Sequence, residues 1–378
     1  MEVTLSTTTT AAVAEPGVGE FAWRTVVLDD PRPDEVLVRI VATSLCHTDL
    51  TVLAGRQPTQ LPAVLGHESA GVVEAVGAGV TLVRPGDQVL LTFNSCGHCP
   101  RCRTGAPTQC ESFFARNFSG RREDGTAPIH GEDGAPIGGQ FFGQSSLAHH
   151  ALVSEHSVVP VEAADDDELA ALAPVNCGVQ AGAGTVLNVL RPQPGDSIAV
   201  FGAGAVGLSA VLAARLTAAT TIIAVDIIDS RLKLAGELGA QHLVNSTGIE
   251  LPATLRDLTG GTGPTHIVET TGVPPLLEQA IEAIASHGTV AVVGAPGGDA
   301  RASFNINAMI DGRTVRGVTC GASDRINFIP TLVELHRQGR LPFDRMIRTY
   351  TPDQLGQAVA DARSGHTLKP VIRFARQS

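Results

Sequence analysis

The sequence is short of positive charge, of aromatic residues and of long hydrophobic runs. Its 378 residues include 27 Lys and Arg against 38 Asp and Glu, and its aromatic residues are one Trp, one Tyr and 12 Phe. A net charge of −11 without any basic tract argues against nucleic acid or an anionic membrane as the main partner. The scarcity of aromatic residues also argues against a surface on which bases stack.

Targeting segments are not evident either. The Thr-rich start, residues 1–14, has neither a basic region nor an apolar core of the kind found in signal peptides. The stretch 197–225 contains a single charge, but three glycines interrupt it, so we expect a buried strand–helix–strand there and not a membrane span. The sequence predicts a soluble, cytoplasmic protein that does not bind membranes.

The first part of the chain predicts a small β domain. Short β-rich runs at 35–41, 69–76 and 88–91 are separated by turn signals, a pattern typical of a barrel-like domain. Residues 120–139 are rich in Gly, Asp and Pro, and we expect them to form a surface loop.

The sequence changes character from about Leu169. Ala-rich helical stretches alternate with β-branched strands, which predicts a doubly wound parallel sheet and hence an α/β protein. The expected strands of that sheet are 197–201, 221–226, 266–269, 288–293 and 314–319. The tail, 326–378, contains one amphipathic helix near 329–338 and a last strand at 369–374, and we expect it to fold back onto the first domain.

Four of the seven cysteines lie within 15 residues and predict a metal site. Their spacing is C-x2-C-x2-C-x7-C, formed by Cys96, Cys99, Cys102 and Cys110. Four thiolates so spaced can surround one Zn2+ tetrahedrally. An iron–sulfur site is the main alternative, although the ferredoxin run has three residues before its last Cys, not seven. A nucleic-acid zinc ribbon is a second alternative, which the acidic charge disfavours.

A glycine-rich fingerprint predicts a dinucleotide site. The expected strand 197–201 continues directly into Gly202-Ala-Gly204-Ala-Val-Gly207 and an Ala-rich helix. In this context the first Gly allows the tight turn, the second lets backbone approach a pyrophosphate, and the third lets the helix pack on the strand. Asp226 ends the next strand, where a carboxylate holds ribose hydroxyls and favours NAD over NADP, while the nearby Arg231 weakens that preference.

A second metal site is a hypothesis from scattered residues. Cys46, His67 and Cys177 would each be unremarkable alone, but together they form the Cys2His set of a catalytic zinc with one open position. Their convergence does not follow from the sequence alone.

With these motifs the chain resembles the zinc-dependent medium-chain dehydrogenases, and among them the aryl (benzyl) alcohol dehydrogenases. The resemblance covers essentially the whole chain and rests on an ordered series of motifs: SLCHTD (44–49), GHESAGVVEAVG (66–77), RPGDQV (84–89), the four-Cys lobe, FFGQSS (141–146), NCGVQAGAG (176–184), FGAGAVG (201–207), VETTG (268–272) and VGAPG (293–297). It implies a GroES-like catalytic domain over 1–178, to which 323–378 returns, and a Rossmann domain over 179–322.

The resemblance also implies roles for individual residues near the catalytic zinc. Cys46, His67 and Cys177 match the zinc ligands. Asp49 matches the partner that orients His67, as metal-bound histidines usually donate to a carboxylate. Glu68 matches the acid behind the zinc that is thought to assist ligand exchange, and Thr48 matches the hydroxyl that first accepts the proton of the alcohol.

On the cofactor side, the resemblance places Val206 behind the nicotinamide and the strand end at Val292 and Gly294 against its carboxamide. Arg373 resembles a pyrophosphate contact, with His47 a plausible second one. One departure concerns the proton relay, because many alcohol dehydrogenases have a histidine where this chain has Thr51. Either another group completes the relay, with His47 or a water as candidates, or the proton leaves by a different path.

The implied reaction is hydride transfer between a primary alcohol and NAD, with zinc acting as the Lewis acid. Five residues fall in segments that resemble pocket walls in the family, and their mostly apolar character suits an aryl or allylic alcohol: Phe93, Phe141, Phe142, Ala295 and Thr319. Cys320 is expected to be an inert thiol on a strand. The alternatives are a thiol-adduct (formaldehyde-type) or polyol dehydrogenase, or a non-catalytic NAD-binding relative. A homodimer or homotetramer is expected.

Overall fold

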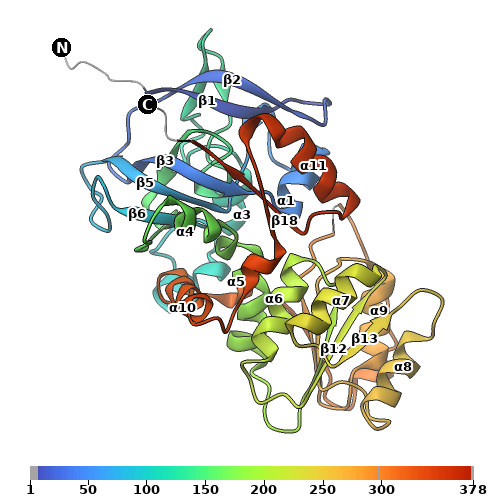
Figure 1. The fold of residues 1–378 in the computed structure, drawn as a ribbon. Helices are drawn as coiled ribbons and strands as arrows, with labels where there is room; N and C mark the ends of the chain where they lie inside the picture. The colour runs from blue at the N-terminus through green and yellow to red at the C-terminus, as the bar shows by residue number, and fades with distance from the viewer. Residues whose placement is uncertain (1–6, 297, 376–378) are drawn as a thin grey trace. The chain divides into compact units, whose positions relative to one another are not determined.

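The computed structural model describes residues 7–296 and 298–375, which separate into two compact units (Figure 1). The first unit contains the chain up to Cys177, together with Asp324–Val333 and the chain from Asp344 onward. The second unit contains Gly178–Ser323 and Glu334–Phe343. The first six residues of the Thr-rich start, and Gly297 of the VGAPG motif, lie outside the described residues.

The first unit is built on two sheets, as expected for a barrel-like β domain. The five-stranded sheet has the order β4 (Ala63–Val64), β1 (Thr7–Ala14), β2 (Phe21–Leu28), β7 (Ile129–Gly131) and β8 (Pro136–Ile137). The seven-stranded sheet has the order β10 (Val158–Pro160), β6 (Gln88–Leu91), β5 (Ser69–Val76), β3 (Glu35–Ser44), β18 (Lys369–Arg373) and β17 (Ile347–Tyr350), with β9 (His150–Ser154) also paired to β3.

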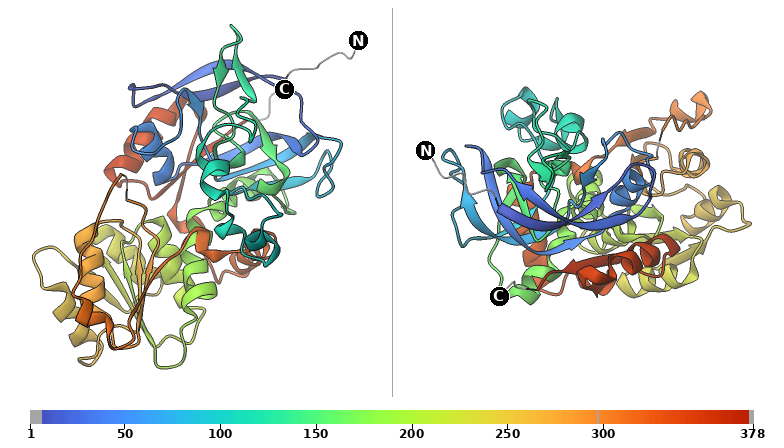
Figure 2. Two further views of the ribbon diagram at one scale, coloured as in Figure 1. Left: turned by 180° about the vertical axis from the view of Figure 1, so that it is seen from behind. Right: turned by 90° about the horizontal axis from the view of Figure 1, so that it is seen from above.

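Strand β3 is the centre of the first unit. Nine of its ten residues are buried, in keeping with its near-continuous run of Val, Ile, Leu and Ala. It pairs antiparallel with β5, so that Thr43 lies opposite Ser69, and with β18, so that Thr43 lies opposite Ile372. The C-terminal strand therefore lies in the first unit, beside residues more than 300 positions earlier, whereas Glu334–Phe343 of the same tail belong to the second unit (Figures 1 and 2).

The second unit contains the expected doubly wound sheet. Six strands, all parallel, follow the order β13 (His242–Asn245), β12 (Thr221–Asp226), β11 (Ser197–Phe201), β14 (His266–Glu269), β15 (Thr289–Val292) and β16 (Thr314–Gly317). Views from the front and from behind show helices on both faces of the sheet (Figures 1 and 2). Apolar strand residues such as Phe201, Ile223 and Ile267 are fully buried and form the core beneath these helices.

The helices are mostly short. Those of the first unit are α1 (His47–Leu53), α2 (Pro100–Arg103), α3 (Phe113–Phe118), α4 (Asp166–Ala171) and α11 (Leu355–Ser364). Those of the second unit are α5 (Gly178–Gly184), α6 (Ala205–Ala214), α7 (Asp229–Leu238), α8 (Leu251–Leu258) and α9 (Pro274–Ala283). Helix α10 spans Arg325–Arg337. Within the described ranges, none of the helices combines the length and the apolar character that a bilayer crossing requires.

Several local expectations were wrong. The expected loop 120–139 contains strands β7 and β8. With three and two residues these strands are too short to show a period of two, and the turn between them is rich in loop-forming residues. For the Thr-rich start no conformation was predicted, and its described part, Thr7–Ala14, is strand β1, since Thr is β-branched and suits a sheet. Strand β13 was not predicted at all.

Cys320 does not lie on a strand. Strand β16 ends at Gly317, and Cys320 begins a 3-10 turn with a left-handed φ of 45°. The β-branched run 314–319 suggested a longer strand; the backbone is still extended at Thr319, but the pairing with β15 ends at Gly317 and the turn begins at Cys320.

Candidate functional site

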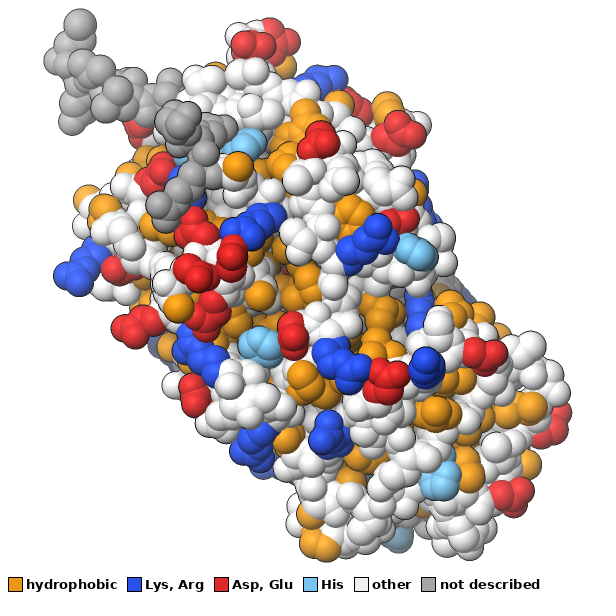
Figure 3. Space-filling model, in the orientation of Figure 1, with side chains coloured by type: hydrophobic (Ala, Val, Ile, Leu, Met, Phe, Trp, Pro, Cys, Tyr) orange, Lys and Arg blue, Asp and Glu red, His pale blue; other side chains and the backbone are white. Residues whose placement is uncertain are grey.

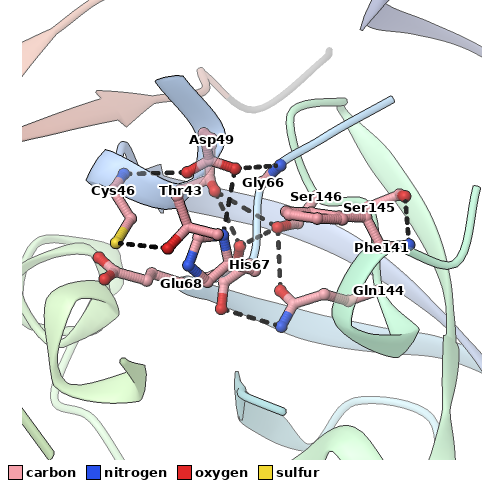
Figure 4. Close-up of polar contacts among 12 residues, drawn as sticks. Thr43, Cys46, Asp49, Gly66, His67, Glu68, Phe141, Gln144, Ser145 and Ser146 are labelled. Atoms are coloured by element: carbon pink, nitrogen blue, oxygen red, sulfur yellow. Dashed lines mark hydrogen bonds and ion pairs between the residues drawn. The ribbon is translucent and has the colours of Figure 1, made fainter. Parts of the chain in front are cut away.

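Four side chains from three segments of the first unit lie close together, and Figure 4 shows three of them, Cys46, His67 and Glu68. Cys46 precedes α1, His67 and Glu68 precede β5, and Cys177 ends the first long segment of the unit. One potential ligand atom from each of these four residues lies within 4.8 Å of those of the other three. The three expected catalytic ligands therefore lie together, with the Glu68 carboxylate beside them.

Asp49 holds two of these ligands in place. Its Oδ2 accepts the backbone N–H of Cys46 at 2.9 Å, and its Oδ1 accepts the N–H of Gly66 at 3.0 Å. The same Oδ1 lies 3.1 Å from His67 Nδ1, and the Asp49 side chain is fully buried. A carboxylate in this position fixes the ring orientation and leaves the other ring nitrogen available to a metal.

The chain reaches His67 through a turn that only glycine accommodates. Gly66 has a φ of +91°, and a Cβ built on it would lie 2.5 Å from the backbone nitrogen of Leu147. Both the left-handed conformation and the close approach of another backbone exclude a side chain at this position.

His67 provides the test of whether the site suits a metal. Its Nε2 is buried and has no hydrogen-bond partner among the described residues. Burial disfavours the charged ring, but the Asp49 carboxylate outweighs this effect and raises the pKa of His67 well above its usual range. A hydrogen bond with Cys177 in turn lowers the pKa of the Cys46 thiol well below its usual range. Zinc binding would displace the proton of His67 and leave a thiolate and a neutral imidazole nitrogen as donors, a combination that fits the ion.

Two phenylalanine rings enclose the His67 ring. Phe142 stacks on it with ring centroids 4.4 Å apart, and Phe141 meets it edge-on at 5.4 Å. Phe142 adopts a left-handed backbone conformation, with a φ of 52°, and this places its ring in the stack. Phe93, the third expected wall of the first unit, is also buried.

Glu68 is paired with Lys369, a residue that the sequence analysis did not single out. Lys369 Nζ on β18 lies 2.6 Å from Glu68 Oε1, and both side chains are buried. Burial raises the pKa of Glu68 even though Lys369 opposes the shift. Burial works against the Lys369 ammonium as well, but Glu68 raises its pKa overall.

The residues of the expected proton relay lie on or beside α1. Thr48 Oγ1 lies 3.8 Å from Cys46 Sγ. Thr51 donates its hydroxyl to the carbonyl of Thr48 at 2.9 Å and is buried. His47 is exposed at the start of α1. Thr51 is therefore engaged with the backbone of its own helix.

The four clustered cysteines form a second centre, with their sulfur atoms again within 4.8 Å of one another. The N–H of Cys96 donates to Cys110 Sγ and the N–H of Cys99 to Cys96 Sγ, both at 3.3 Å. A hydrogen bond from the Glu111 backbone is the main cause that lowers the pKa of Cys99 to about 6. His98 remains exposed and bonds the Cys96 carbonyl, so it is not part of the cluster. Four sulfur donors arranged in this way suit a structural zinc.

The glycine-rich loop of the second unit has the shape of a phosphate cradle. Gly202 has a φ of +90°, and a Cβ on Gly207 would lie 1.7 Å from the carbonyl oxygen of Gly202. A Cβ on Gly204 would meet no atom within 4 Å, so the space above it is open at the N-terminus of α6. Open space beside the N–H groups of a helix terminus suits a pyrophosphate.

Asp226 lies at the carboxyl end of β12, beside this loop. Its Oδ2 accepts the N–H of Ala203 at 2.6 Å, and its Oδ1 accepts the N–H groups of Ile227 and Ile228. Arg231 lies on α7, and its buried Nε has no hydrogen-bond partner among the described residues.

The other expected cofactor residues are distributed as follows. Val206 lies in the first turn of α6, and Val292 ends β15. Gly294 packs closely on Gly272, since a Cβ built on Gly294 would lie 2.1 Å from the backbone nitrogen of Gly272. Arg373 lies on β18 in the first unit, where it forms an ion pair with Asp167. Ala295 and Thr319, the expected walls from the second unit, are exposed within it.

Known proteins resemble the chain over its full length. The alcohol dehydrogenase GroES-like domain family matches residues 32–163, and the zinc-binding dehydrogenase family matches residues 205–335. A geraniol dehydrogenase of Castellaniella defragrans is 42% identical over 367 residues, which cover 96% of this chain and 97% of that protein.

Two solved structures are similar in both sequence and fold. The benzyl alcohol dehydrogenase of Acinetobacter calcoaceticus has a TM-score of 0.93 at 42% identity, covering 98% of this chain and 100% of that one. An alcohol dehydrogenase zinc-binding domain protein of Burkholderia ambifaria has a TM-score of 0.94 at 48% identity with the same coverage.

Proposed function

This chain belongs to the zinc-containing medium-chain alcohol dehydrogenases, and we propose that its substrates are aryl or allylic primary alcohols, which it oxidises to aldehydes with NAD. The resemblance stated from the motifs is confirmed, as are the GroES-like and Rossmann architecture and the two zinc sites. NAD follows from the family. The substrate class is the part that we propose, and the relatives named for benzyl alcohol and geraniol support it.

The observation that carries the proposal is the buried donor set next to two aromatic rings. Cys46, His67 and Cys177 would hold the catalytic zinc, and Phe141 and Phe142 pack against the His67 ring. When bound there, zinc supplies a Lewis acid that favours the deprotonated form of an alcohol. Aromatic walls close to the reacting carbon suit a benzyl or allylic group.

The protein's own groups orient this site and move the proton. Asp49 fixes the tautomer and the direction of the His67 ring. The Thr48 hydroxyl, beside Cys46, is placed to accept the proton that the alcohol loses. Because Thr51 is bonded to the Thr48 carbonyl, we assign the next step to the exposed His47 or to water.

We propose that the Rossmann domain, residues 179–322, binds NAD; these residues fall within the second unit, which contains Gly178–Ser323 and Glu334–Phe343. The open space above Gly204 would take the pyrophosphate, and Asp226 would face the ribose hydroxyls. Val206, Val292 and Gly294 are assigned to the nicotinamide, and Arg373 and Arg231 to the phosphates or ribose of the cofactor.

We also infer a homo-oligomer. Strand β16 is an edge strand whose four residues are all exposed, and Ile306 and Ile310, shortly before it, are 76% and 78% exposed. An open strand edge next to exposed isoleucines is typically covered, and a second copy of the same chain would cover it symmetrically. Size-exclusion chromatography with light scattering of Ile310→Lys against wild type tests this.

Location and partners are inferred from composition. None of the seven cysteines forms a disulfide, which suits a reducing compartment such as the cytoplasm. On the face drawn in Figure 3, Lys and Arg side chains lie among acidic ones and form no continuous basic surface over the described residues. A small alcohol or aldehyde is therefore the proposed partner, rather than a nucleic acid.

The test is NAD reduction by the purified protein with benzyl, cinnamyl, geranyl and short aliphatic alcohols, with Cys46→Ser as the control that lacks a zinc ligand. The highest kcat/KM on aryl or allylic alcohols, lost in Cys46→Ser, is expected. Turnover confined to a thiol adduct or a polyol would replace the proposed substrate, and no turnover with both zinc ions and NAD bound would indicate a non-catalytic relative.

A further inference from the structure

The FFGQSS motif contributes two polar side chains, Gln144 and Ser146, that are not themselves candidate zinc ligands. Both are completely buried, and their hydrogen bonds lead toward the catalytic site (Figure 4). Buried polar side chains are retained at a cost unless every group is satisfied, so their partners are informative.

Gln144 joins two segments of the first unit through one amide group. Its Nε2 donates to the carbonyl of His67 at 3.0 Å and to the carbonyl of Thr92 at 2.9 Å. Its Oε1 accepts the hydroxyl of Ser146 at 2.9 Å. Both amide hydrogens and the amide oxygen are thus engaged, and only an amide of this length can donate to two carbonyls while accepting from a hydroxyl.

From Gln144 the network reaches the segment of Cys177. The Thr92 hydroxyl donates to the carbonyl of Asn176 at 2.6 Å, and Asn176 Nδ2 donates to the carbonyl of Ser69 at 2.9 Å. Asn176 directly precedes Cys177, and Ser69 follows His67 by two residues. Two of the zinc-ligand segments are therefore fixed to each other through Gln144 and Thr92.

From Ser146 the network reaches the segment of Cys46. The Ser69 hydroxyl lies 2.9 Å from Thr43 Oγ1 and also contacts Ser146 Oγ, and Ser146 Oγ lies 3.3 Å from Thr43 Oγ1. Thr43 precedes Cys46 by three residues on the same chain segment. Every one of the three ligand segments is thus connected to Gln144 or Ser146.

The backbone on either side of Gln144 is held in an uncommon conformation. Phe142 and Ser145 both have a φ of 52°, in the left-handed region that non-glycine residues seldom adopt. Ser145 is fixed there because its hydroxyl donates to the carbonyl of Val64 at 2.7 Å and accepts the N–H of Phe141 at 3.0 Å. Strained conformations of this kind persist where the surroundings require them, often beside functional sites.

We propose that Gln144 and Ser146 are positioning residues of the catalytic zinc site, which hold the segments of Cys46, His67 and Cys177 in the geometry that retains the metal. The inference rests on the zinc site assigned above but not on the identity of the alcohol. It predicts that disruption of this network loosens one zinc and leaves the other unaffected.

The test compares Gln144→Met and Ser146→Ala with Gln140→Met. Gln140 is the matched control, since it is a buried glutamine four residues earlier whose amide donates to the Leu152 carbonyl at 3.3 Å, away from any zinc ligand. A metallochromic dye follows the release of zinc to a chelator from the two-zinc protein in the absence of alcohol. Cys46→Ser lacks a ligand of the catalytic zinc, so the zinc that this variant releases identifies the signal of the four-cysteine site. The cobalt-substituted catalytic site gives a second readout through its ligand-field spectrum.

We expect Gln144→Met to release the catalytic zinc about tenfold faster and to shift the cobalt spectrum, in line with the usual effect of residues that support metal ligands. Ser146→Ala should show a smaller increase in the rate of zinc release. Gln140→Met should change neither the release rate nor the cobalt spectrum, whatever its effect on thermal stability. Release of the catalytic zinc at the wild-type rate in Gln144→Met, or equally fast release in Gln140→Met, would overturn the proposal. If Gln144→Met does not fold, Ser146→Ala decides, because it keeps the amide.

Discussion

Lys369 Nζ lies 2.6 Å from Glu68 Oε1, although 301 residues separate the two in the chain. Both side chains are buried, and Glu68 is the neighbour of the zinc ligand His67. The last strand of the protein is therefore tied electrostatically to the catalytic site, and the integrity of that site depends on the return of the chain to the first unit.

Removal of one member of this pair should destabilise the fold. In Lys369→Met the Glu68 carboxylate loses its buried cation, and we expect a loss of about 3–5 kcal/mol in the free energy of unfolding. The double variant Lys369→Met with Glu68→Gln should recover part of this loss. Denaturant unfolding of the wild type, the two single variants and the double variant measures the coupling. Arg24→Met is the control: it breaks the ion pair Arg24–Glu15, whose side chains are 53% and 23% exposed, and we expect less than about 1 kcal/mol. Additive effects of the two substitutions would contradict the assigned coupling.

The hydroxyls of Thr48 and Thr51 should differ sharply in their effect on catalysis. Thr48→Ala removes the group placed to accept the proton, and we expect kcat to fall by about 100-fold or more, with Thr48→Ser largely retaining it. Thr51→Ala removes a hydroxyl that is bonded to a backbone carbonyl, so kcat should change by less than about threefold while stability decreases slightly. Steady-state kinetics with one alcohol measures both, and an equal loss in the two alanine variants would refute the assignment.

Loss of the four-cysteine site should lower the stability of the protein more than its catalytic activity. Cys99→Ala removes one sulfur donor, and we expect the protein to carry one zinc instead of two and to lose several kcal/mol of stability, on the order expected for a structural zinc. The control is Cys320→Ser, which changes a cysteine that belongs to neither metal cluster and should retain both ions. Metal analysis by mass spectrometry together with thermal unfolding checks this; two zinc ions in Cys99→Ala would argue against the four-sulfur site.

Asp226 should set the preference for NAD. Its carboxylate receives backbone N–H groups from both the glycine-rich loop and its own turn, which fixes it at the end of β12. In Asp226→Ser the negative charge that disfavours a 2′-phosphate is removed, and we expect the ratio of kcat/KM for NAD over NADP to fall by at least about tenfold. Kinetics with the two cofactors gives the ratio, and an unchanged ratio would show that Asp226 does not face the ribose.

Tyr350 offers a pH prediction that can be observed directly, because it is the only tyrosine in the sequence. Burial, and then its hydrogen bond to Asp361 Oδ2 at 2.6 Å, raises the pKa of Tyr350 above its usual value of about 10. A raised pKa in the folded state stabilises the protein below the unfolded pKa, and this contribution is lost as the pH rises through the folded value.

Ultraviolet titration of tyrosinate should therefore show a midpoint above about 10, and Asp361→Asn should move it downward, since the substitution removes the anionic acceptor. A midpoint that does not move in Asp361→Asn would mean that burial alone accounts for the shift.

The sequence by itself determined the features that depend on local order. Cys96 to Cys110 lie within 15 residues, so their spacing alone indicates that they can surround one metal. The same holds for Gly202 to Gly207, because a strand, a glycine turn and a helix in direct succession form the phosphate cradle without help from distant residues. The parallel sheet also followed from local patterns, since each buried strand is a short β-branched run between helices.

Only the tertiary structure decided which distant residues meet. Nothing in the local sequence around Lys369 shows that β18 pairs with β3 and brings its ammonium to Glu68, and Gln144 carried no assignable role until its amide was seen between the carbonyls of His67 and Thr92. The short strands β7 and β8 were missed for a related reason, since two or three residues are too few to show a period and they gain their stability from their neighbours. The physical reason is the same in each case: local patterns report the preference of a segment for its own conformation, whereas a buried charge or amide is satisfied by partners that only the packing of the whole unit supplies.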